Sequence, residues 1–199
     1  MRALMVDYRL APEHCFPAAP DDCHAAYRWL LAQGYQPNEI VIAGDSAGGN
    51  LALATLQRIK AAGEPMPSCA VLLSPFVDCT LSGESMLSNE PHDPMFTLSG
   101  MLVIRRLYVQ PEQFMDPSAS PLFADFSGLP PMLIQVGDIE MLRDDAVRTA
   151  RKAHAAGVAV ELEIWEGMPH VFQALTILPQ AAAASERIVA YIGEKTGWR

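Results

Sequence analysis

The chain has 199 residues, of which 50% are hydrophobic and 19% are charged, and its formal net charge is −9. This length and composition are typical of one folded domain with a large core, and they exclude a disordered chain. No run of basic residues is longer than Arg105–Arg106. Because nucleic acid is bound through clustered cations, a nucleic-acid partner is not expected.

The sequence predicts neither a membrane span nor a signal peptide. No apolar run is long enough to cross a bilayer, and charged residues interrupt the N-terminus too early for a signal-peptide core. We therefore expect a cytoplasmic protein with no membrane partner. The cysteines form no C-x-x-C pair, and one segment superficially resembles a zinc set through His14, Cys15, Cys23 and His24. Its spacing fits no standard zinc site, so neither a metal nor another cofactor is expected.

Strands and helices are predicted to alternate along the chain. In chain order they are a strand at 2–8, a helix at 23–33, a strand at 39–43, a helix from 47 to about 62, a strand at 68–76, a helix at about 98–109, a strand at 131–137, a helix at about 142–156, a strand at 158–166 and a helix at about 179–195. Asp21 or Asp22 is a candidate cap for the first helix, which Gly34 ends.

This alternation predicts the α/β class, with a mostly parallel sheet and helices on both faces. The strands are continuous apolar runs rather than alternating ones, which agrees with a sheet that is buried on both sides. We find no repeat and no interdomain linker, so residues 1–199 are expected to form one domain. Residues 77–129 are too long for a mere connection, so this insertion is expected to cover something.

A candidate nucleophile lies between the strand at 39–43 and the helix that follows it. Gly44-Asp45-Ser46-Ala47-Gly48 fits the G-x-S-x-G pattern, in which a sharp strand-to-helix turn exposes the serine above a sheet. The helix N-terminus directs free N–H groups at a developing oxyanion, and the Ala47 N–H is the natural first donor. The alternative is an ordinary glycine-rich turn, but the preceding strand and following helix favour a nucleophile.

A serine hydroxyl needs a base, which is expected with its acid after later strands in the order Ser, acid, His. His170 alone follows the last strand, in the turn "EGMPHVF", and imidazole titrates near neutrality. The other histidines are His14 and His24 before the serine, His92 in the insertion and His154 within a helix. A surface-loop histidine without a role is the alternative for His170.

The acid is expected in "VGDIEMLRDD", just past the fourth strand. The candidates are Asp138, Glu140, Asp144 and Asp145. Asp144 and Asp145 lie in the first turn of a helix, where the dipole favours carboxylates for structural reasons. Asp138 follows the strand directly and is expected to be too early to reach across. Glu140 lies in the loop, where a solvated carboxylate without a role is its alternative.

Five ordered blocks of the sequence carry a resemblance: "VDYRLAPEHCFPAAPDD", "GDSAGGNLAL", "LSPFVD", "LPPMLIQVGDIEMLRDD" and "EGMPHVF". Over essentially its whole length the chain resembles the hormone-sensitive-lipase-like (bacterial family IV) esterases of the α/β-hydrolase fold. The resemblance implies that Ser46 is the nucleophile, His170 the base and Glu140 the triad acid. It implies a scaffold role for Asp78, and it places part of a substrate-binding cap in residues 77–129. Apolar cap members that could line an acyl pocket or simply pack on the core are Met95, Phe96, Met101 and Leu102.

The sequence departs from this family at its front. The family carries a His-Gly-Gly-Gly loop before "VDYRLAPE", which completes the oxyanion hole, and this sequence contains no such loop. The resemblance implies that the first family strands and cap helices are also missing. The missing strand next to the loop would lie between the strands at 2–8 and 39–43, which must then pair directly, separate or borrow a strand. We expect Met1 to be an internal methionine of a longer gene or the start of a truncated product.

The expected function is hydrolysis of short- to medium-chain carboxylic esters by Ser46, His170 and Glu140, with small-molecule esters as substrates. The chain as given is expected to be impaired, because losing one oxyanion donor lowers turnover by about two to three orders of magnitude. The alternatives are a hydrolase scaffold that binds a small apolar ligand without turnover, and a deacetylase or amidase of the same fold. The resemblance also makes a homodimer possible.

Overall fold

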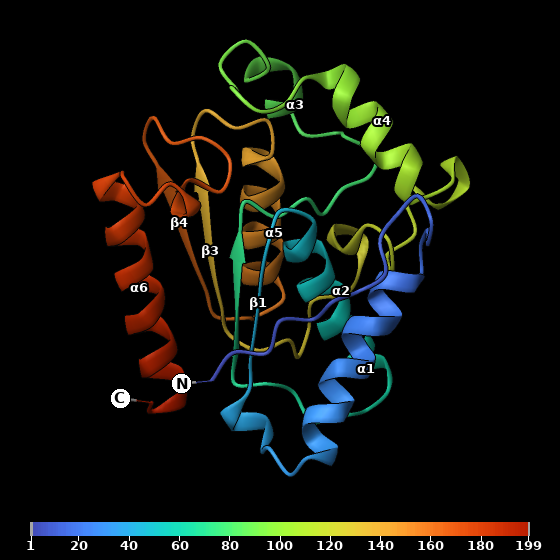
Figure 1. The fold of residues 1–199 in the computed structure, drawn as a ribbon, viewed down its shortest axis with the longest axis vertical. Coiled ribbons are helices and arrows are strands. Elements are labelled where there is room, and N and C mark those ends of the chain that lie inside the picture. Colours follow the sequence, from blue (N-terminus) through green and yellow to red (C-terminus); the bar gives the residue numbers. More distant parts are fainter. Residues whose placement is uncertain (1, 199) are drawn as a thin grey trace.

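Four strands form the central sheet of the computed structural model, which describes residues 2–198 (Figure 1). The strands, in the order in which they lie side by side, are β1 (Val41–Asp45), β2 (Cys69–Leu73), β3 (Met132–Gly137) and β4 (Val160–Trp165). Each neighbouring pair is parallel. The strands predicted at 39–43, 68–76, 131–137 and 158–166 are confirmed, with ends that differ by at most three residues.

Helices cover both faces of this sheet, as predicted. On one face α2 (Ala47–Ala61) packs on β1 and β2, and α5 (Arg143–Ala155) packs on β3 and β4. On the other face α6 (Pro179–Thr196) contacts β2 and β3. The remaining helical segments are α1 (Ala18–Ala32), which packs on α2, the short α3 (Ser85–Ser88), α4 (Leu98–Tyr108), and 3-10 turns at Pro37–Glu39, Pro111–Gln113, Pro121–Phe123 and Phe172–Ala174.

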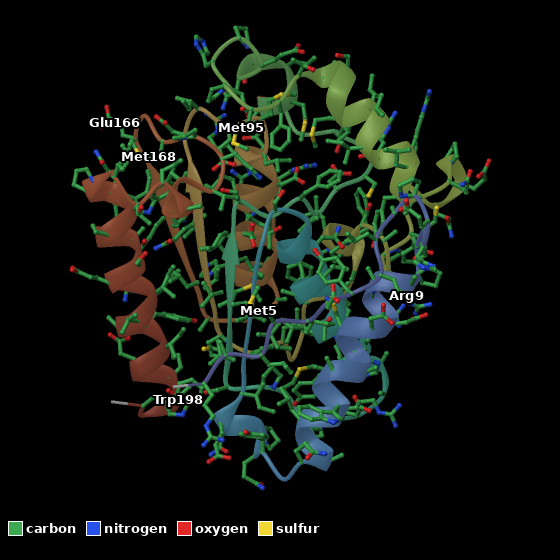
Figure 2. The ribbon with its side chains drawn as sticks, in the orientation of Figure 1. Met5, Arg9, Met95, Glu166, Met168 and Trp198 are labelled. Carbon is green, nitrogen blue, oxygen red and sulfur yellow. The ribbon has the colours of Figure 1, made fainter. Side chains whose placement is uncertain are left out.

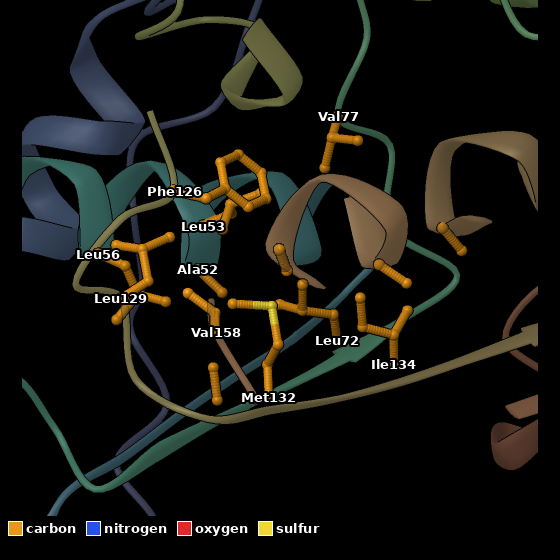
Figure 3. Close-up of a cluster of buried hydrophobic side chains, with 14 of the residues drawn as sticks. Ala52, Leu53, Leu56, Leu72, Val77, Phe126, Leu129, Met132, Ile134 and Val158 are labelled. Carbon is orange, nitrogen blue, oxygen red and sulfur yellow. The ribbon is translucent and has the colours of Figure 1, made fainter. Parts of the chain in front are cut away.

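The side chains of β2 alternate between two hydrophobic clusters. Ala70 and Leu72 point into the cluster beneath α2 and α5, which Figure 3 shows around Leu53 and Met132. Cys69 and Val71 point to the opposite face, where they pack against α6. Successive residues of a strand face opposite sides of a sheet, so an apolar residue at every position means burial on both faces. The predicted burial on both faces is therefore confirmed for β2 and β3, whereas the edge strands β1 and β4 are only partly buried.

The strand predicted at residues 2–8 is wrong. This segment has no regular secondary structure, and the exposed fractions of Leu4 and Met5 are 49% and 88%. The apolar run indicates a segment suited to a sheet, but a strand forms only where a neighbour pairs with its backbone. Within residues 2–198, β1 is an edge strand with no partner on its outer side. The segments at 2–8 and 39–43 therefore do not pair with each other and do not gain a strand between them.

The first helix begins five residues earlier than predicted, and its predicted N-terminal cap is wrong, whereas Gly34 follows its C-terminal end as predicted, with φ 91°. It starts at Ala18 and includes Pro20 in its first turn, where a missing backbone N–H costs no helical hydrogen bond. Neither aspartate caps it. Asp21 lies inside the first turn and forms an ion pair with Arg58 at 2.6 Å, and Asp22 binds Arg9 at 2.8 Å.

Residues 77–129 connect β2 to β3 and contain α3 and α4. Figure 1 shows both helices above the carboxyl ends of the strands. The helix predicted at 98–109 is confirmed as α4, and the Thr97 hydroxyl caps it by accepting a hydrogen bond from Gly100 N at 3.1 Å. The insertion thus lies over the carboxyl ends of the strands, where the loops that follow the parallel strands come together.

Two buried carboxylates and one arginine attach the start of this insertion to α5. Asp145, in the first turn of α5, accepts hydrogen bonds from Val77 N at 2.9 Å and Asp78 N at 3.1 Å. Arg148 forms ion pairs with Asp78 at 2.9 Å and with Asp145 at 2.8 Å. Both carboxylate side chains are fully buried. This arrangement agrees with the scaffold role expected for Asp78.

The two carboxylates that share Arg148 have pKa values shifted in opposite directions. Burial raises the pKa of Asp145 to about 7, although Arg148 opposes the shift. Burial also raises the pKa of Asp78, but hydrogen bonds from Ser82 and Thr80, together with Arg148, outweigh it and bring that pKa below its usual value. Asp78 therefore carries the negative charge that pairs with Arg148 more firmly than Asp145 does.

Replacing Asp145 by alanine is expected to lower the free energy of unfolding by about 3 kcal/mol or more, because two buried N–H groups lose their acceptor and Arg148 loses a partner. Asp21→Ala is the matched control, since Asp21 also lies in a first helical turn and pairs with an arginine but has a side chain that is 51% exposed. It should cost less than about 1 kcal/mol. Urea denaturation followed by tryptophan fluorescence measures both, and equal losses would contradict the buried-anchor interpretation.

Candidate active site

Ser46 lies at a strained turn between β1 and α2. Its backbone has φ 52° and ψ −117°, a conformation that a residue with a side chain rarely adopts. Hydrogen bonds hold both backbone polar groups of Ser46: its N donates to Leu73 O at 2.8 Å, and its O accepts from Phe76 N at 3.1 Å. This is the geometry expected of a nucleophile elbow, where strain exposes the hydroxyl at the end of the sheet.

Two glycines make this turn possible, and only one of them flanks Ser46 in the G-x-S-x-G pattern. A Cβ atom on Gly44 would lie 2.1 Å from Gly48 O, and one on Gly49 would lie 2.7 Å from the Cβ of Pro75. A Cβ atom on Gly48 would meet nothing closer than 3.8 Å. The close approach of strand, helix and the Pro75 segment therefore requires glycine at 44 and 49, whereas space alone does not require it at 48.

The N-terminus of α2 begins immediately after Ser46. Ala47 is the first residue of this helix, and the first N–H groups of a helix have no acceptor within it. No acidic residue stands in the first turn of α2. The free N–H groups and the positive end of the helix dipole favour an anion beside Ser46. One carboxylate lies nearby, because Asp45 Oδ1 would be 3.8 Å from a Cβ atom on Gly48.

His170 and Glu140 form a buried pair. The His170 Nδ1 atom lies 2.9 Å from Glu140 Oε2, and the exposed fractions of the two side chains are 3% and 0%. A carboxylate only accepts hydrogen bonds, so Nδ1 carries the proton in the neutral ring and Nε2 carries the lone pair. The pair therefore fixes the imidazole in the tautomer that a general base needs.

The second oxygen of the Glu140 carboxylate is held by two donors. Oε1 accepts hydrogen bonds from Gly137 N at 2.5 Å and from the Ser74 hydroxyl at 2.7 Å. Gly137 also lies against the turn that precedes His170, because a Cβ atom there would be 1.9 Å from Met168 O. The absence of a side chain at 137 thus lets the turn after β4 approach the loop that carries Glu140.

The insertion holds the Glu140 loop from the other side. Asn89 donates from Nδ2 to Asp138 O at 2.8 Å and to Glu140 O at 2.9 Å. Asp93 accepts from Met141 N at 2.8 Å through one oxygen. These supporting side chains were not predicted, because a polar residue in a long loop gives no sequence signal for its distant partner.

Asp93 also connects the insertion to the imidazole. Its second oxygen accepts hydrogen bonds from Met95 N at 2.8 Å and Phe96 N at 3.1 Å. The ring of Phe96 stands edge-on to His170, with ring centroids 4.8 Å apart and an interplanar angle of 72°. Figure 2 shows Met95 and Met168, which precedes His170, at the same end of the molecule. The insertion therefore forms one wall around the imidazole.

The other candidate carboxylates have structural partners. Asp138 accepts from Gly167 N at 2.7 Å, Asp144 accepts from Ser85 N at 3.0 Å, and Asp145 anchors the insertion. Of the remaining histidines, His24 pairs with Glu64 at 2.7 Å, whereas His14, His92 and His154 are exposed. Among the candidates, only Glu140 and His170 are brought together.

The Ser46 turn and the His170–Glu140 pair are both attached to the end of β2, through its last residue Leu73 and through Ser74, which follows it. Leu73 O binds Ser46 N, and the Ser74 hydroxyl binds Glu140 Oε1. Within residues 2–198 no hydrogen bond joins the Ser46 hydroxyl to the His170 ring. Such catalytic contacts are often long in unliganded enzymes and tighten when substrate binds.

A cavity of about 240 Å³ opens beside Ala47. Its walls come from the segment before α1, from the start of α2 and from α4, through Tyr8, Arg9, Leu10, Ala11, His14, Ala19, Ala47, Asn50, Leu51, Phe76, Ile104, Leu107 and Tyr108. None of the four predicted acyl-pocket residues lines it. Met101 is buried in the core, and Phe96 contacts His170. Within α4, the residues that face the cavity lie one turn further along the helix.

Two other kinds of site are absent from the part of the chain that the structure describes. Across residues 2–198, no helix combines the length and the apolar character needed to cross a bilayer. The same residues bring together no group of three or more His, Cys, Asp or Glu side chains that could hold a metal ion.

A family model described as the α/β-hydrolase fold matches residues 1–174. An esterase from Acinetobacter venetianus is 42% identical over 193 residues, which cover 96% of this chain and 64% of the relative. Two solved structures each cover 96% of the chain with TM-scores of 0.93. One is an esterase from the bacterial hormone-sensitive lipase family, 47% identical with 64% of its chain covered. The other is EstE5 soaked by p-nitrophenyl butyrate, 44% identical with 65% covered.

The chain thus spans a little under two thirds of the length of these relatives. The match of the family model covers most of the chain, and the similarity to solved esterases extends over both the sheet and its helices. The chain therefore belongs to the α/β-hydrolase fold family, within the hormone-sensitive-lipase-like group of esterases.

Proposed function

We propose that this chain carries the reaction centre of a serine carboxylesterase. In this proposal Ser46 is the nucleophile, His170 is the general base and then the general acid, and Glu140 orients the imidazole. The observation that supports it most is the buried His170–Glu140 pair, which is attached through Ser74 to the same end of β2 as the strained Ser46 turn.

The first step is attack of the Ser46 hydroxyl oxygen on the ester carbonyl carbon. His170 Nε2 takes the hydroxyl proton as the new C–O bond forms, and the carbonyl oxygen becomes an oxyanion. Glu140 stabilises the resulting imidazolium through the Nδ1 hydrogen bond. The Ala47 N–H at the start of α2 donates to the oxyanion.

In the second step the tetrahedral intermediate collapses and the bond to the alcohol oxygen breaks. His170 gives its proton to that oxygen, the alcohol leaves, and Ser46 remains acylated. Water then attacks the acyl carbon, with His170 again accepting and returning a proton, so the acid leaves and the serine is regenerated. Every proton moves through His170, and the proposed mechanism therefore calls for no cofactor.

Stabilisation of the oxyanion is the weakest part of this proposed centre. The 199 residues contain no His-Gly-Gly-Gly segment, so the proposed oxyanion contacts reduce to the N-terminus of α2. Removing a single donor lowers turnover by about 100-fold to 1,000-fold in other serine hydrolases. We therefore expect slow turnover from this chain alone.

The proposed substrates are esters with an uncharged acyl group of short to medium length. The cavity beside Ala47 is lined mainly by apolar side chains, including Leu51, Ile104 and Leu107. A solved relative was soaked with p-nitrophenyl butyrate, an ester of this class. An apolar wall next to the nucleophile favours an acyl chain over a charged group, because burying a charge without a partner is unfavourable.

Labelling with a fluorophosphonate probe tests the proposed nucleophile, because the probe reacts only with an activated serine and needs no particular substrate. Ser46→Ala should abolish labelling, and His170→Ala and Glu140→Ala should slow it by at least about 100-fold, because each removes part of the activation. Ser118→Ala, an exposed serine on the insertion, is the matched control and should label normally. Labelling that survives Ser46→Ala would reject the proposal, and a folded chain that never labels would favour a binding module.

Substitution on α4 tests the proposed acyl site. Ile104→Trp should fill part of the cavity and lower the ratio of kcat/KM for p-nitrophenyl hexanoate to that for p-nitrophenyl acetate by about tenfold or more, since each rejected methylene is worth about 10-fold to 200-fold. Val103→Trp is the control, because it introduces the same side chain at the neighbouring, 57% exposed position, outside the cavity wall. An unchanged ratio in both variants would place the acyl chain elsewhere.

A further inference from the structure

Ser74 carries a buried hydroxyl that the proposed chemistry does not use. It directly follows β2, its exposed fraction is 0%, and its backbone is left-handed with φ 45°. A residue other than glycine, asparagine or aspartate is uncommon in this conformation. Ser74 N donates to Gln135 O at 2.8 Å, and this bond to the neighbouring strand helps to hold the strained backbone.

The hydroxyl of Ser74 contacts both the loop that carries Glu140 and the loop that carries His170. It donates to Glu140 Oε1 at 2.7 Å and accepts from Val171 N at 3.1 Å. A serine hydroxyl has one donor and two acceptor positions, so both bonds can form together. One oxygen atom therefore joins the carboxylate to the residue that immediately follows His170.

These bonds restrict the carboxylate to one orientation. Oε1 is engaged by Gly137 N and Ser74, which leaves Oε2 for His170. Rotation of the buried carboxylate away from the imidazole would break two charge-assisted hydrogen bonds, which are stronger than bonds between neutral groups. Val171 also has a left-handed backbone, with φ 49°, so its N–H is aimed by the same strained turn that presents the imidazole.

We propose that Ser74 is a positioning residue that aligns Glu140 and His170 with each other and with Ser46. Its neighbour Leu73 holds Ser46 N at 2.8 Å, so a two-residue segment fixes the three proposed catalytic side chains relative to the sheet. The inference rests on the proposed function, and it adds a fourth side chain that acts through the acid and the base without touching substrate.

Two substitutions separate the hydroxyl from the backbone at this position. Ser74→Ala and Ser74→Gly both remove the hydroxyl, but glycine adopts φ 45° without strain. Ser85→Ala is the matched control. Ser85 is equally buried, and its hydroxyl donates to Met141 O and accepts from Asp144 N, so it stabilises the same loop without contacting the Glu140 carboxylate.

The rate of fluorophosphonate labelling resolves into a maximal rate, kinact, and a half-saturating probe concentration, KI. Both Ser74 variants are expected to lower kinact by about 10-fold to 100-fold, the loss of one hydrogen bond to a charged group, with KI unchanged. Ser85→Ala should lower the unfolding midpoint while keeping kinact close to that of the unsubstituted chain. Amide hydrogen exchange of Val171, measured by NMR, should become faster in both Ser74 variants and not in Ser85→Ala.

The outcomes that would overturn the inference differ from those that would overturn the proposed function. If Ser74→Gly keeps its kinact while Ser74→Ala loses it, only the backbone matters and the positioning role is rejected. The role is also rejected if all three variants lose kinact equally. If the unsubstituted chain is not labelled at Ser46, the proposed function fails instead. In that case unchanged exchange of Val171 would still overturn the contact on which the inference depends.

Discussion

The structure at the carboxyl end of the sheet depends on one buried carboxylate. Glu140 is fully shielded from water, and an ionised group in that position is strongly unfavourable unless hydrogen-bond donors surround it. Three donors do so, from a strand end, a strained serine and an imidazole: Gly137 N, the Ser74 hydroxyl and His170 Nδ1. Satisfying the charge and orienting the imidazole are therefore the same set of contacts.

The insertion also supports the backbone that carries Glu140. Asn89 and Asp93 bind the backbone on both sides of the Glu140 side chain, and Asp93 also orders the segment that places Phe96 against His170. The start of the insertion is fixed in turn by Asp145 and Arg148 of α5. A change in the insertion would consequently reach the imidazole through hydrogen-bonded backbone, without any contact to substrate.

Close approach between loops is the second constraint. Gly137 and Gly49 both stand where another segment passes within a Cβ atom's reach, Met168 O in one case and Pro75 in the other. Gly137 lets the turn before His170 approach the loop that carries Glu140. Gly49 lets the segment after β2 approach the start of α2. The two contacts draw the loops after β1, β2, β3 and β4 towards one point, at which the proposed chemistry takes place.

The sequence by itself determined most of the secondary-structure elements and the order in which the candidate nucleophile, acid and base follow one another along the chain. Apolar runs and the alternation of strands with helices predicted five strands and their helices, of which the strand at 2–8 does not form. These patterns succeed where local geometry and burial decide the structure. The G-x-S-x-G turn identified Ser46, and the position after the last strand singled out His170. The resemblance to known esterases was needed to choose Glu140 among four carboxylates.

Tertiary structure alone decided which distant groups touch. The contacts of Ser74 with Glu140 and Val171 span 66 and 97 residues, and no local pattern encodes them. It also decided that the apolar segment at 2–8 remains outside the sheet, since pairing depends on a neighbouring strand and not on the segment's own composition. Periodicity describes what a segment can bury, whereas packing and available hydrogen-bond partners determine where it is buried.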